Sequence, residues 1–204
     1  MTDLFREQAK EWDQRPIPQQ ISDAVVRAVR DAIPLHADTV LLDFGAGTGL
    51  LASKLAPHVA RVVAVDVSEA MLTQLATKPE LQGKVEIVCR DLVQTPAEPA
   101  LDGTVDVVVS AMAMHHVQDT RALLRSLSAH LVPGGRVALA DLDAEDGTFH
   151  PPGTEGVYHS GFHRDALAAL LREAGFTDIH FTTACEVQKE ARSYPIFLVT
   201  ATKP

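Results

Sequence analysis

The sequence predicts an α/β fold with helices packed on both faces of a largely parallel sheet. From Val40 onward, short apolar runs alternate with amphipathic ones, a pattern typical of strands that alternate with helices. Each apolar run is continuous, as expected of a strand that is covered on both faces. Two β-rich segments close the chain with no helix between them, which indicates a terminal hairpin.

Two helices are expected before the first strand. Apolar residues within 4–12 fall near one helical face until Pro16 and Pro18 interrupt the pattern, and helical spacing resumes over 17–33 until Pro34. The alternating part then predicts strands at 40–44, 61–66, 85–90, 105–111 and 136–142, and helices at 50–55, 68–77 and 119–131.

Ser68 and Asp119 are the expected N-caps of two of these helices. A loop rich in Gly, Pro, acids and His follows Leu142, and a helix at 164–174 ends at Gly175. The closing hairpin strands are expected at 177–187 and 194–201, and Pro195 places the start of the second strand just after itself.

The composition indicates one acidic globular domain. The chain has 204 residues, is 46% hydrophobic and carries a formal net charge of −9, which disfavours nucleic acid as the main partner. Cys89 and Cys185 lie far apart in apolar stretches, which predicts buried thiols in a reducing compartment. No signal core and no run of about 18 apolar residues occur. A cytoplasmic protein without membrane contact is expected.

The turn after the first expected strand carries three glycines, Gly45, Gly47 and Gly49. Ligands of open parallel sheets bind beyond the carboxyl ends of the strands, and glycine lets the backbone approach them closely. The spacing is GxGxG and not the dinucleotide fingerprint GxGxxG, since position 50 is leucine. Asp43 is poorly placed beside a pyrophosphate but suits a ligand with an ammonium group. S-adenosylmethionine carries such a group, and also a carboxylate for the N–H-rich turn.

Acidic residues also end the second and third strands. Asp66 can accept hydrogen bonds from both ribose hydroxyls of a cofactor. Sites for dinucleotides and sites for S-adenosylmethionine both use such a carboxylate, so Asp66 alone does not distinguish them. Asp91 could accept from an adenine amino group, with Leu92 offering a backbone N–H and an apolar wall.

Six segments in order, spanning roughly residues 38–176, carry a family resemblance: LLDFGAGTG, VVAVDVSEAML, CRDL, MHHVQD, LVPGGRVAL and LLREAGF. Together they resemble the class I S-adenosylmethionine-dependent methyltransferases, in particular the small type 11 (UbiE/menaquinone-methyltransferase-like) group. The resemblance implies a Rossmann-like, doubly wound, seven-stranded sheet, mostly parallel with an antiparallel last strand. It also implies a single domain over 1–204, with a helical lead-in or lid at 1–37 and the core at 38–204.

The same resemblance implies which residues surround the cofactor. The implied cofactor-binding residues are Asp43, Gly45, Gly47, Gly49, Asp66, Val67, Met71, Asp91, Leu92, Ser110, Ala111 and Met112. Several have structural alternatives: Asp66 could cap the next helix, Asp91 could be a turn residue, and Met71, Ser110 and Met112 could simply pack. Trp12 is expected to anchor packing more than to cover the cofactor.

Methyl transfer is an in-line displacement that needs a base only if the acceptor must lose a proton. The candidate bases are His116, His150 and His159. The segment 141–163 should face the substrate, because it follows the fifth strand. Phe162 within this segment is a further candidate for contact with the substrate. A 2-His-1-carboxylate metal site is conceivable there, but the spacing of these residues matches no helical or loop metal-binding motif, so no metal is predicted.

These observations predict a methyltransferase that acts on a small-molecule acceptor and releases S-adenosylhomocysteine. Two alternatives remain at this stage: an NAD-dependent oxidoreductase, and a protein that binds S-adenosylmethionine without catalysis. The sequence leaves the acceptor and the oligomeric state open.

Overall fold

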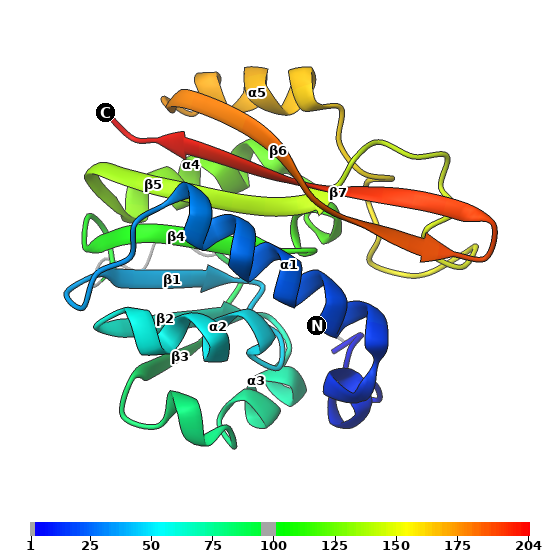
Figure 1. Cartoon of the computed structure of the whole chain (residues 1–204), viewed down its shortest axis with the longest axis horizontal. Coiled ribbons are helices and arrows are strands. Elements are labelled where there is room, and N and C mark those ends of the chain that lie inside the picture. Colours follow the sequence, from blue (N-terminus) through cyan, green and yellow to red (C-terminus); the bar gives the residue numbers. More distant parts are fainter. Residues whose placement is uncertain (1–2, 95–100) are drawn as a thin grey trace.

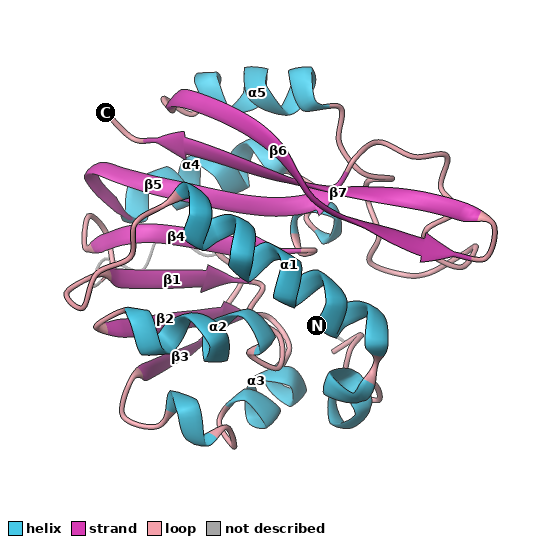
Figure 2. Ribbon diagram, in the orientation of Figure 1, coloured by secondary structure: helices cyan, strands magenta, loops and turns pink. Residues whose placement is uncertain are grey.

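The computed structural model describes residues 3–94 and 101–204 and contains a seven-stranded sheet (Figure 1, Figure 2). The strands are β1 Val40–Phe44, β2 Arg61–Asp66, β3 Val85–Cys89, β4 Val105–Ala111, β5 Leu131–Leu142, β6 Thr177–Lys189 and β7 Arg192–Thr202. They lie in the order β3-β2-β1-β4-β5-β7-β6. Neighbours among β1 to β5 pair in parallel, and β7 is antiparallel to both β5 and β6. The predicted fold class is confirmed.

Helices cover both faces of the sheet. They are α1 Pro16–Ala32, α2 Leu50–Leu55, α3 Glu69–Leu75, α4 Thr120–His130 and α5 Arg164–Glu173, with the 3-10 helices η1 Ala9–Gln14, η2 Ala56–His58, η3 Pro79–Leu81 and η4 Met114–His116. Residues of α1, α2 and α3 contribute to one apolar cluster, and residues of α4 and α5 contribute to the other. In Figure 1, α1 crosses in front of the central strands and α4 lies behind them. This two-sided cover makes the sheet doubly wound.

Local sequence signals explain where several helices begin. The Ser68 hydroxyl accepts a hydrogen bond from the Met71 N–H at 3.2 Å, and the Asp119 carboxylate accepts one from the Ala122 N–H at 2.9 Å. Both predicted N-caps are therefore confirmed. Gly175, with φ of +92°, follows α5 as expected.

The strand order reverses at β1, which lies between β2 and β4. The chain leaves β1 toward one side of the sheet and leaves β4 toward the other, so a crevice forms beyond their carboxyl ends. The glycine turn follows β1, and the tandem histidines of η4 follow β4. The fold thus places the two most distinctive motifs of the sequence at the same edge of the sheet.

Three expectations about elements were wrong in detail. Residues 4–12 do not form an α-helix, since only the 3-10 helix η1 forms there, and Arg15 is extended as residues before proline tend to be. Strand β5 begins at Leu131 and not at 136, because Leu131 already pairs with Val105. Strand β7 includes Pro195, which was expected to precede it.

Proline is tolerated in β7 because of the direction in which Pro195 faces. Its carbonyl oxygen accepts a hydrogen bond from the Asp143 N–H at 3.0 Å, on the side of β5. The ring nitrogen of an extended residue points the same way as its carbonyl. Pairing between β5 and β7 reaches only as far as Leu142 with Ile196, so no β5 strand acceptor lies opposite the proline nitrogen.

The cysteines also depart from expectation. Cys89 is exposed and Cys185 is partly exposed, although both were predicted to be buried. Each lies on an edge strand, β3 or β6, where one side of the strand has no neighbour. Both are free thiols.

Beyond the end of β5, the hairpin of β6 and β7 continues past the rest of the sheet, and the loop over 143–163 runs beside it (Figure 1). Arg192 pairs with Asp146 at 2.6 Å, and the Thr148 hydroxyl lies 2.9 Å from the Tyr194 hydroxyl. The hairpin therefore supports the loop. Within residues 3–94 and 101–204, no helix is long and apolar enough to cross a bilayer.

Candidate active site

The glycine turn after β1 has the conformation that glycine permits. Gly45, Gly47 and Gly49 all have positive φ, at +68°, +54° and +80°. A Cβ at Gly45 would lie 2.2 Å from the Cβ of Ala113, so the turn packs directly on the segment that follows β4. A Cβ at Gly47 would meet only the Gly45 carbonyl oxygen, 4.0 Å away, among the described atoms. The turn is thus tight toward β4 and open above Gly47.

Asp43 is the least satisfied polar group beside this turn. It is 1% exposed, and its Oδ2 atom has no hydrogen-bond partner among the described residues. Burial, and then the nearby Asp66 carboxylate, raise the pKa of Asp43 to about 8, while a hydrogen bond from the Ala52 backbone opposes the shift. A buried carboxylate without a partner is costly. The site therefore fits a ligand that brings an ammonium group to Asp43.

Asp66 joins the glycine turn to the end of β2. Its Oδ2 accepts a hydrogen bond from the Gly47 N–H at 2.7 Å, and its Oδ1 accepts one from the Ser68 N–H at 2.8 Å. Burial raises the pKa of Asp66, and these backbone hydrogen bonds oppose the rise. The carboxylate is therefore held in a fixed orientation at the crevice. Asp66 is not the N-cap of α3, which is Ser68, although it accepts a hydrogen bond from the Ser68 N–H.

The other predicted cofactor residues differ in how they are placed. Val67 is 54% exposed on the rim, whereas Met71 and Leu92 are buried. Asp91 Oδ1 accepts from the backbone N–H groups of Val93 and Gln94, at 2.8 and 3.1 Å. These contacts are those of a turn residue, which is the structural alternative that the sequence leaves open for Asp91.

Three further candidates lie at the end of β4. The Ser110 hydroxyl is buried and donates to the Phe44 carbonyl at 2.8 Å, so its side chain ties β4 to β1. Ala111 and Met112 are partly buried against the apolar cluster beneath α1 and α2. Met112 has φ of +58°, which turns the chain sharply out of the strand.

The N-terminal segment contacts the same region through two acidic residues. The Asp3 carboxylate accepts from the Ser68 hydroxyl at 2.8 Å and from the Ala70 N–H at 3.2 Å. Asp13 accepts from the Thr48 hydroxyl at 2.5 Å, inside the glycine turn, and pairs with Lys78 at 2.8 Å. Two acidic residues thus hold this segment against both sides of the crevice.

Three histidine rings meet beyond β4 and β5; His115, His116 and His150 are called the histidine cluster below. The Nδ1 atom of His115 lies 2.7 Å from Asp141 Oδ1, and its Nε2 atom lies 3.1 Å from His150 Nε2. The backbone N–H of His115 also donates to Asp141 Oδ2, at 3.1 Å. The Nδ1 atom of His116 lies 2.7 Å from the Gly156 carbonyl oxygen.

Burial makes the two more accessible rings poor proton acceptors. It lowers the pKa of His116 to about 4, helped by the neighbouring His115 and opposed by the Gly156 hydrogen bond. It lowers the pKa of His150 to about 4 as well, helped by His115 and Lys189. Both rings are therefore neutral near pH 7.

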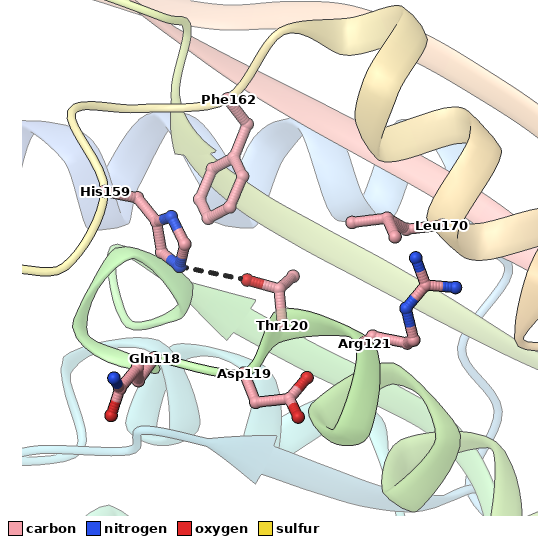
Figure 3. A pocket seen from close by; sticks show the side chains of 7 residues that line it. All are labelled: Gln118, Asp119, Thr120, Arg121, His159, Phe162 and Leu170. Carbon is pink, nitrogen blue, oxygen red and sulfur yellow. Dashed lines mark hydrogen bonds between the residues drawn. The ribbon is translucent and has the colours of Figure 1, made fainter.

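The side chain of His159 lies outside this cluster, in a shallow hollow at the start of α4 (Figure 3), although its backbone N–H donates to the His115 carbonyl at 3.3 Å. The hollow is lined by Gln118, Asp119, Thr120, Arg121, His159, Phe162 and Leu170. The Nε2–H of His159 donates to the Val117 carbonyl at 2.9 Å and lies 3.3 Å from the Thr120 hydroxyl. The fold thus brings His116 and His150 together, and it places His159 with Phe162 in a second location.

Sequence reasoning missed His115, Asp3, Asp13 and Thr48 as site residues. The signal for His115 was present, because two consecutive histidines directly after a strand both fall at the ligand-binding edge of the sheet. The contacts of Asp3 and Asp13 join residues that are far apart in the chain, and no local pattern marks them.

Comparisons with known proteins agree with this geometry. A family model described as a methyltransferase domain matches residues 12–181. An uncharacterized methyltransferase of Geobacillus kaustophilus is 29% identical over 194 residues, which are 86% of this chain and 88% of that protein. One from Schizosaccharomyces pombe is 30% identical over 151 residues, 68% of this chain, but the match spans only 53% of that longer protein.

A solved structure supports the fold independently. The crystal structure of an S-adenosylmethionine-dependent methyltransferase from Aquifex aeolicus has a TM-score of 0.73, at 22% identity and with 100% of both chains covered. The family match takes in the glycine turn, the end of β2 and the histidine cluster, and it favours methyl transfer over the nicotinamide alternative. From its sequence, its topology and its relatives, the chain belongs to the class I S-adenosylmethionine-dependent methyltransferases.

Proposed function

We propose that this chain transfers the methyl group of S-adenosylmethionine, in line, to a small-molecule acceptor, and releases S-adenosylhomocysteine. The observation that carries the proposal is the buried Asp43 carboxylate, whose Oδ2 atom has no partner among the described residues beside an open glycine turn. An ammonium group is the partner that such a carboxylate requires.

In this proposal the methionine portion lies along Gly45, Gly47 and Gly49, with its ammonium group at Asp43. Asp66 accepts from the ribose hydroxyls, because its carboxylate is already oriented by two backbone N–H groups. The exposed side chain of Val67 offers an apolar surface for the adenine ring.

The remaining cofactor residues have lesser roles. Met71 and Leu92 form the buried base of the adenine site, and Asp91 keeps one carboxylate oxygen for the adenine edge. Ala111 and Met112 form the floor near the sulfonium, where Ser110 contributes through its backbone position.

When bound, the cofactor supplies a methyl carbon on a positively charged sulfur, which a lone pair of the acceptor can attack while the carbon–sulfur bond breaks. The chain's own contribution is to align the acceptor and to exclude water. The loop over 143–163 suits this task because it is fixed in place. Arg164 holds Asp143 through two hydrogen bonds of 2.7 and 2.6 Å, and the Phe162 N–H donates to the Leu142 carbonyl at 2.9 Å.

The three candidate histidines then face the acceptor from two places. His116 and His150 belong to the histidine cluster, and His159 belongs to the hollow with Phe162. Because the Nε2–H of His159 donates to a carbonyl, its Nδ1 atom carries the lone pair that can accept from a substrate hydroxyl or amine.

Calorimetric titration with S-adenosylhomocysteine tests the cofactor site. We expect binding to the wild-type chain, and an affinity about 10- to 100-fold lower for Asp66→Asn, which removes a charged hydrogen-bond acceptor. Asp31→Asn, at an exposed position of α1, is the matched control and should bind as the wild type does. Equal affinity of wild type and Asp66→Asn would contradict the assignment.

Transfer of a labelled methyl group tests the acceptor. The purified chain would be incubated with methyl-labelled S-adenosylmethionine and, separately, with the small-molecule, protein and nucleic-acid fractions of a cell extract. We expect label in the small-molecule fraction. Label only in a macromolecular fraction would contradict the acceptor class, and cofactor binding without transfer to any fraction would favour the non-catalytic alternative.

Membership of the type 11 group and a cytoplasmic location are part of the same proposal. The six ordered motifs support the first, and the acidic composition with two free cysteines supports the second. The net charge of −9 also argues against nucleic acid as the acceptor.

A further inference from the structure

The histidine cluster has a feature that methyl transfer alone does not require. One ring nitrogen from each of His115, His116 and His150 lies within 4.8 Å of the other two. Two of the rings come from η4, directly after β4, and the third comes from the loop after β5. Residues about 35 positions apart in the chain are thus brought to one point by the fold.

The hydrogen bonds of the cluster decide which nitrogens carry lone pairs. A carbonyl oxygen can only accept, so His116 donates its Nδ1–H to Gly156 and presents a lone pair on Nε2. Asp141 accepts from the backbone N–H of His115, and its other oxygen lies 2.7 Å from Nδ1 of the same ring. His115 therefore also presents a lone pair on Nε2.

We propose that the histidine cluster binds one divalent transition-metal ion, of the zinc kind, through the Nε2 atoms of His115, His116 and His150. The 3.1 Å between Nε2 of His115 and Nε2 of His150 is close to the separation of about 3.3 Å that two imidazoles have on a tetrahedral zinc ion. Neutral imidazoles are favoured ligands of such ions, whereas magnesium and calcium prefer oxygen.

The surroundings of the rings are those of a supported metal site. A carboxylate that receives the Nδ1–H of a histidine fixes the ring and strengthens it as a metal ligand, and Asp141 does this for His115. Asp141 is fully buried and also accepts from the Leu142 N–H at 2.7 Å, so it cannot turn away easily.

His150 is held by its neighbour in the chain. Phe149 is buried against the Tyr194 ring, with 5.3 Å between the ring centroids, and its backbone N–H donates to Glu145 at 3.1 Å. Lys189 contacts the Phe149 carbonyl oxygen. The loop therefore presents His150 from a fixed backbone.

Direct hydrogen bonding among the rings explains the cluster less completely. The short contact between His115 and His150 uses one lone pair, and among the described residues it leaves the lone pair of His116 unused, although a ring nitrogen of His116 lies within 4.8 Å of a ring nitrogen of each of the other two. A cation accepts all three lone pairs at once. His116 and His150 are also only partly buried, so an ion held by them keeps an open side.

That open side has a use that rests on the proposed function. Ala113, which contacts the glycine turn at Gly45, precedes His115 by two residues, so the cluster lies next to the proposed cofactor site. A hydroxyl or thiol acceptor bound to the ion would lose its proton to solvent at neutral pH. Its lone pair would then form the bond to the methyl carbon as the carbon–sulfur bond breaks.

Cobalt titration of the full chain tests the site. The protein would be stripped with a chelator and titrated with Co²⁺, whose visible spectrum reports coordination by nitrogen, and then with Zn²⁺ in competition. We expect saturation at about one ion per chain. His150→Ala should weaken Co²⁺ binding by at least about 100-fold, and Asp141→Asn by about 10- to 100-fold.

His163→Ala is the matched control, because His163 is exposed and lies at the end of the same loop. It should bind Co²⁺ as the wild type does. Because His150 lies in a loop, His150→Ala should keep its fold, and circular dichroism with S-adenosylhomocysteine titration checks this on the same samples. Absence of Co²⁺ and Zn²⁺ binding by the wild type, or wild-type binding by His150→Ala, would overturn the inference.

The two proposals fail separately in this experiment. A chain that binds S-adenosylhomocysteine but no metal retains the proposed function and loses the metal site. A chain that binds metal through the histidine cluster but no S-adenosylhomocysteine supports the metal site and contradicts the proposed function.

Discussion

Replacement of Asp43 by asparagine should stabilise the cofactor-free protein, and the gain should grow with pH. Folding raises the pKa of this carboxyl from 3.8 to about 8, so between those values the folded state holds a proton that the unfolded state has lost. Wild-type stability then falls as pH rises through this window, by up to about 1.4 kcal/mol per pH unit. Above pH 8, the full cost of the buried charge is on the order of 5 kcal/mol.

Asparagine has nearly the shape of aspartate but carries no charge at any pH. The free energy of unfolding of Asp43→Asn should therefore exceed that of the wild type by several kcal/mol near pH 9, and by much less near pH 5. The same variant should bind S-adenosylhomocysteine more weakly, because the ammonium group loses its partner. Greater stability would thus accompany lower function.

Urea unfolding at about pH 5, 7 and 9, followed by circular dichroism, measures the difference. Asp31→Asn is the control for the loss of one exposed carboxylate of α1. A difference between wild type and Asp43→Asn that is equal at pH 5 and pH 9 would refute the reasoning, since it would mean that Asp43 is not a buried titrating group.

Three further predictions concern the same region. The affinity for S-adenosylhomocysteine should rise between about pH 6 and about pH 7.5, because the free protein must release the Asp43 proton on binding; calorimetry in buffers of different ionisation enthalpy would detect that proton. Gly45→Ala should cost on the order of 3 kcal/mol in urea unfolding, since φ is +68° and the new Cβ would lie 2.2 Å from that of Ala113; adding Ala113→Gly should restore part of the loss. Asp143→Ala should cost roughly 1 kcal/mol and speed proteolysis of the 143–163 loop, because Arg164 loses a two-point contact that is only partly exposed.

The central strands and their succession along the chain were predictable, because a strand that is buried on both faces shows a run of apolar residues in the sequence. Runs such as 61–66 and 105–111 are largely apolar, and the structure has β2 and β4 with these bounds. The errors lie where a distant partner decides the outcome. Leu131 is extended because it pairs with Val105. Pro195 fits in β7 because pairing with β5 ends at Ile196, so no β5 strand acceptor lies opposite the proline nitrogen. Neither feature is visible in the local sequence.

The site divides in the same way. Glycine spacing and a carboxylate at a strand end are local features that directly reflect close backbone approach and charge, so Asp43, Gly47 and Asp66 could be picked out in advance. The histidine cluster could not, because it needs the loop after β5 to fold back over β4 and bring His150 within 3.1 Å of His115. A one-dimensional spacing rule finds no metal motif in such a set.

The predicted role of residues 1–37 as a lid depends on two contacts that tie the N-terminal segment to the crevice. Asp13 accepts from the Thr48 hydroxyl within the glycine turn, and Asp3 accepts from the Ser68 hydroxyl beside Asp66. If the segment covers the cofactor, Asp13→Ala should release S-adenosylhomocysteine about tenfold faster, which is the order of magnitude for the loss of a charge-assisted hydrogen bond.

Stopped-flow displacement of a fluorescent cofactor analogue would measure that rate, with Asp23→Ala, on the exposed side of α1, as the control. Limited proteolysis gives a second measurement. Asp13→Ala without ligand should be cut within the first fifteen residues sooner than the wild type, and bound S-adenosylhomocysteine should slow the cut in both. Because Lys78 also loses its partner when Asp13 is removed, Lys78→Ala separates the two contacts. A wild-type release rate in Asp13→Ala would mean that the segment packs beside the cofactor site without closing it.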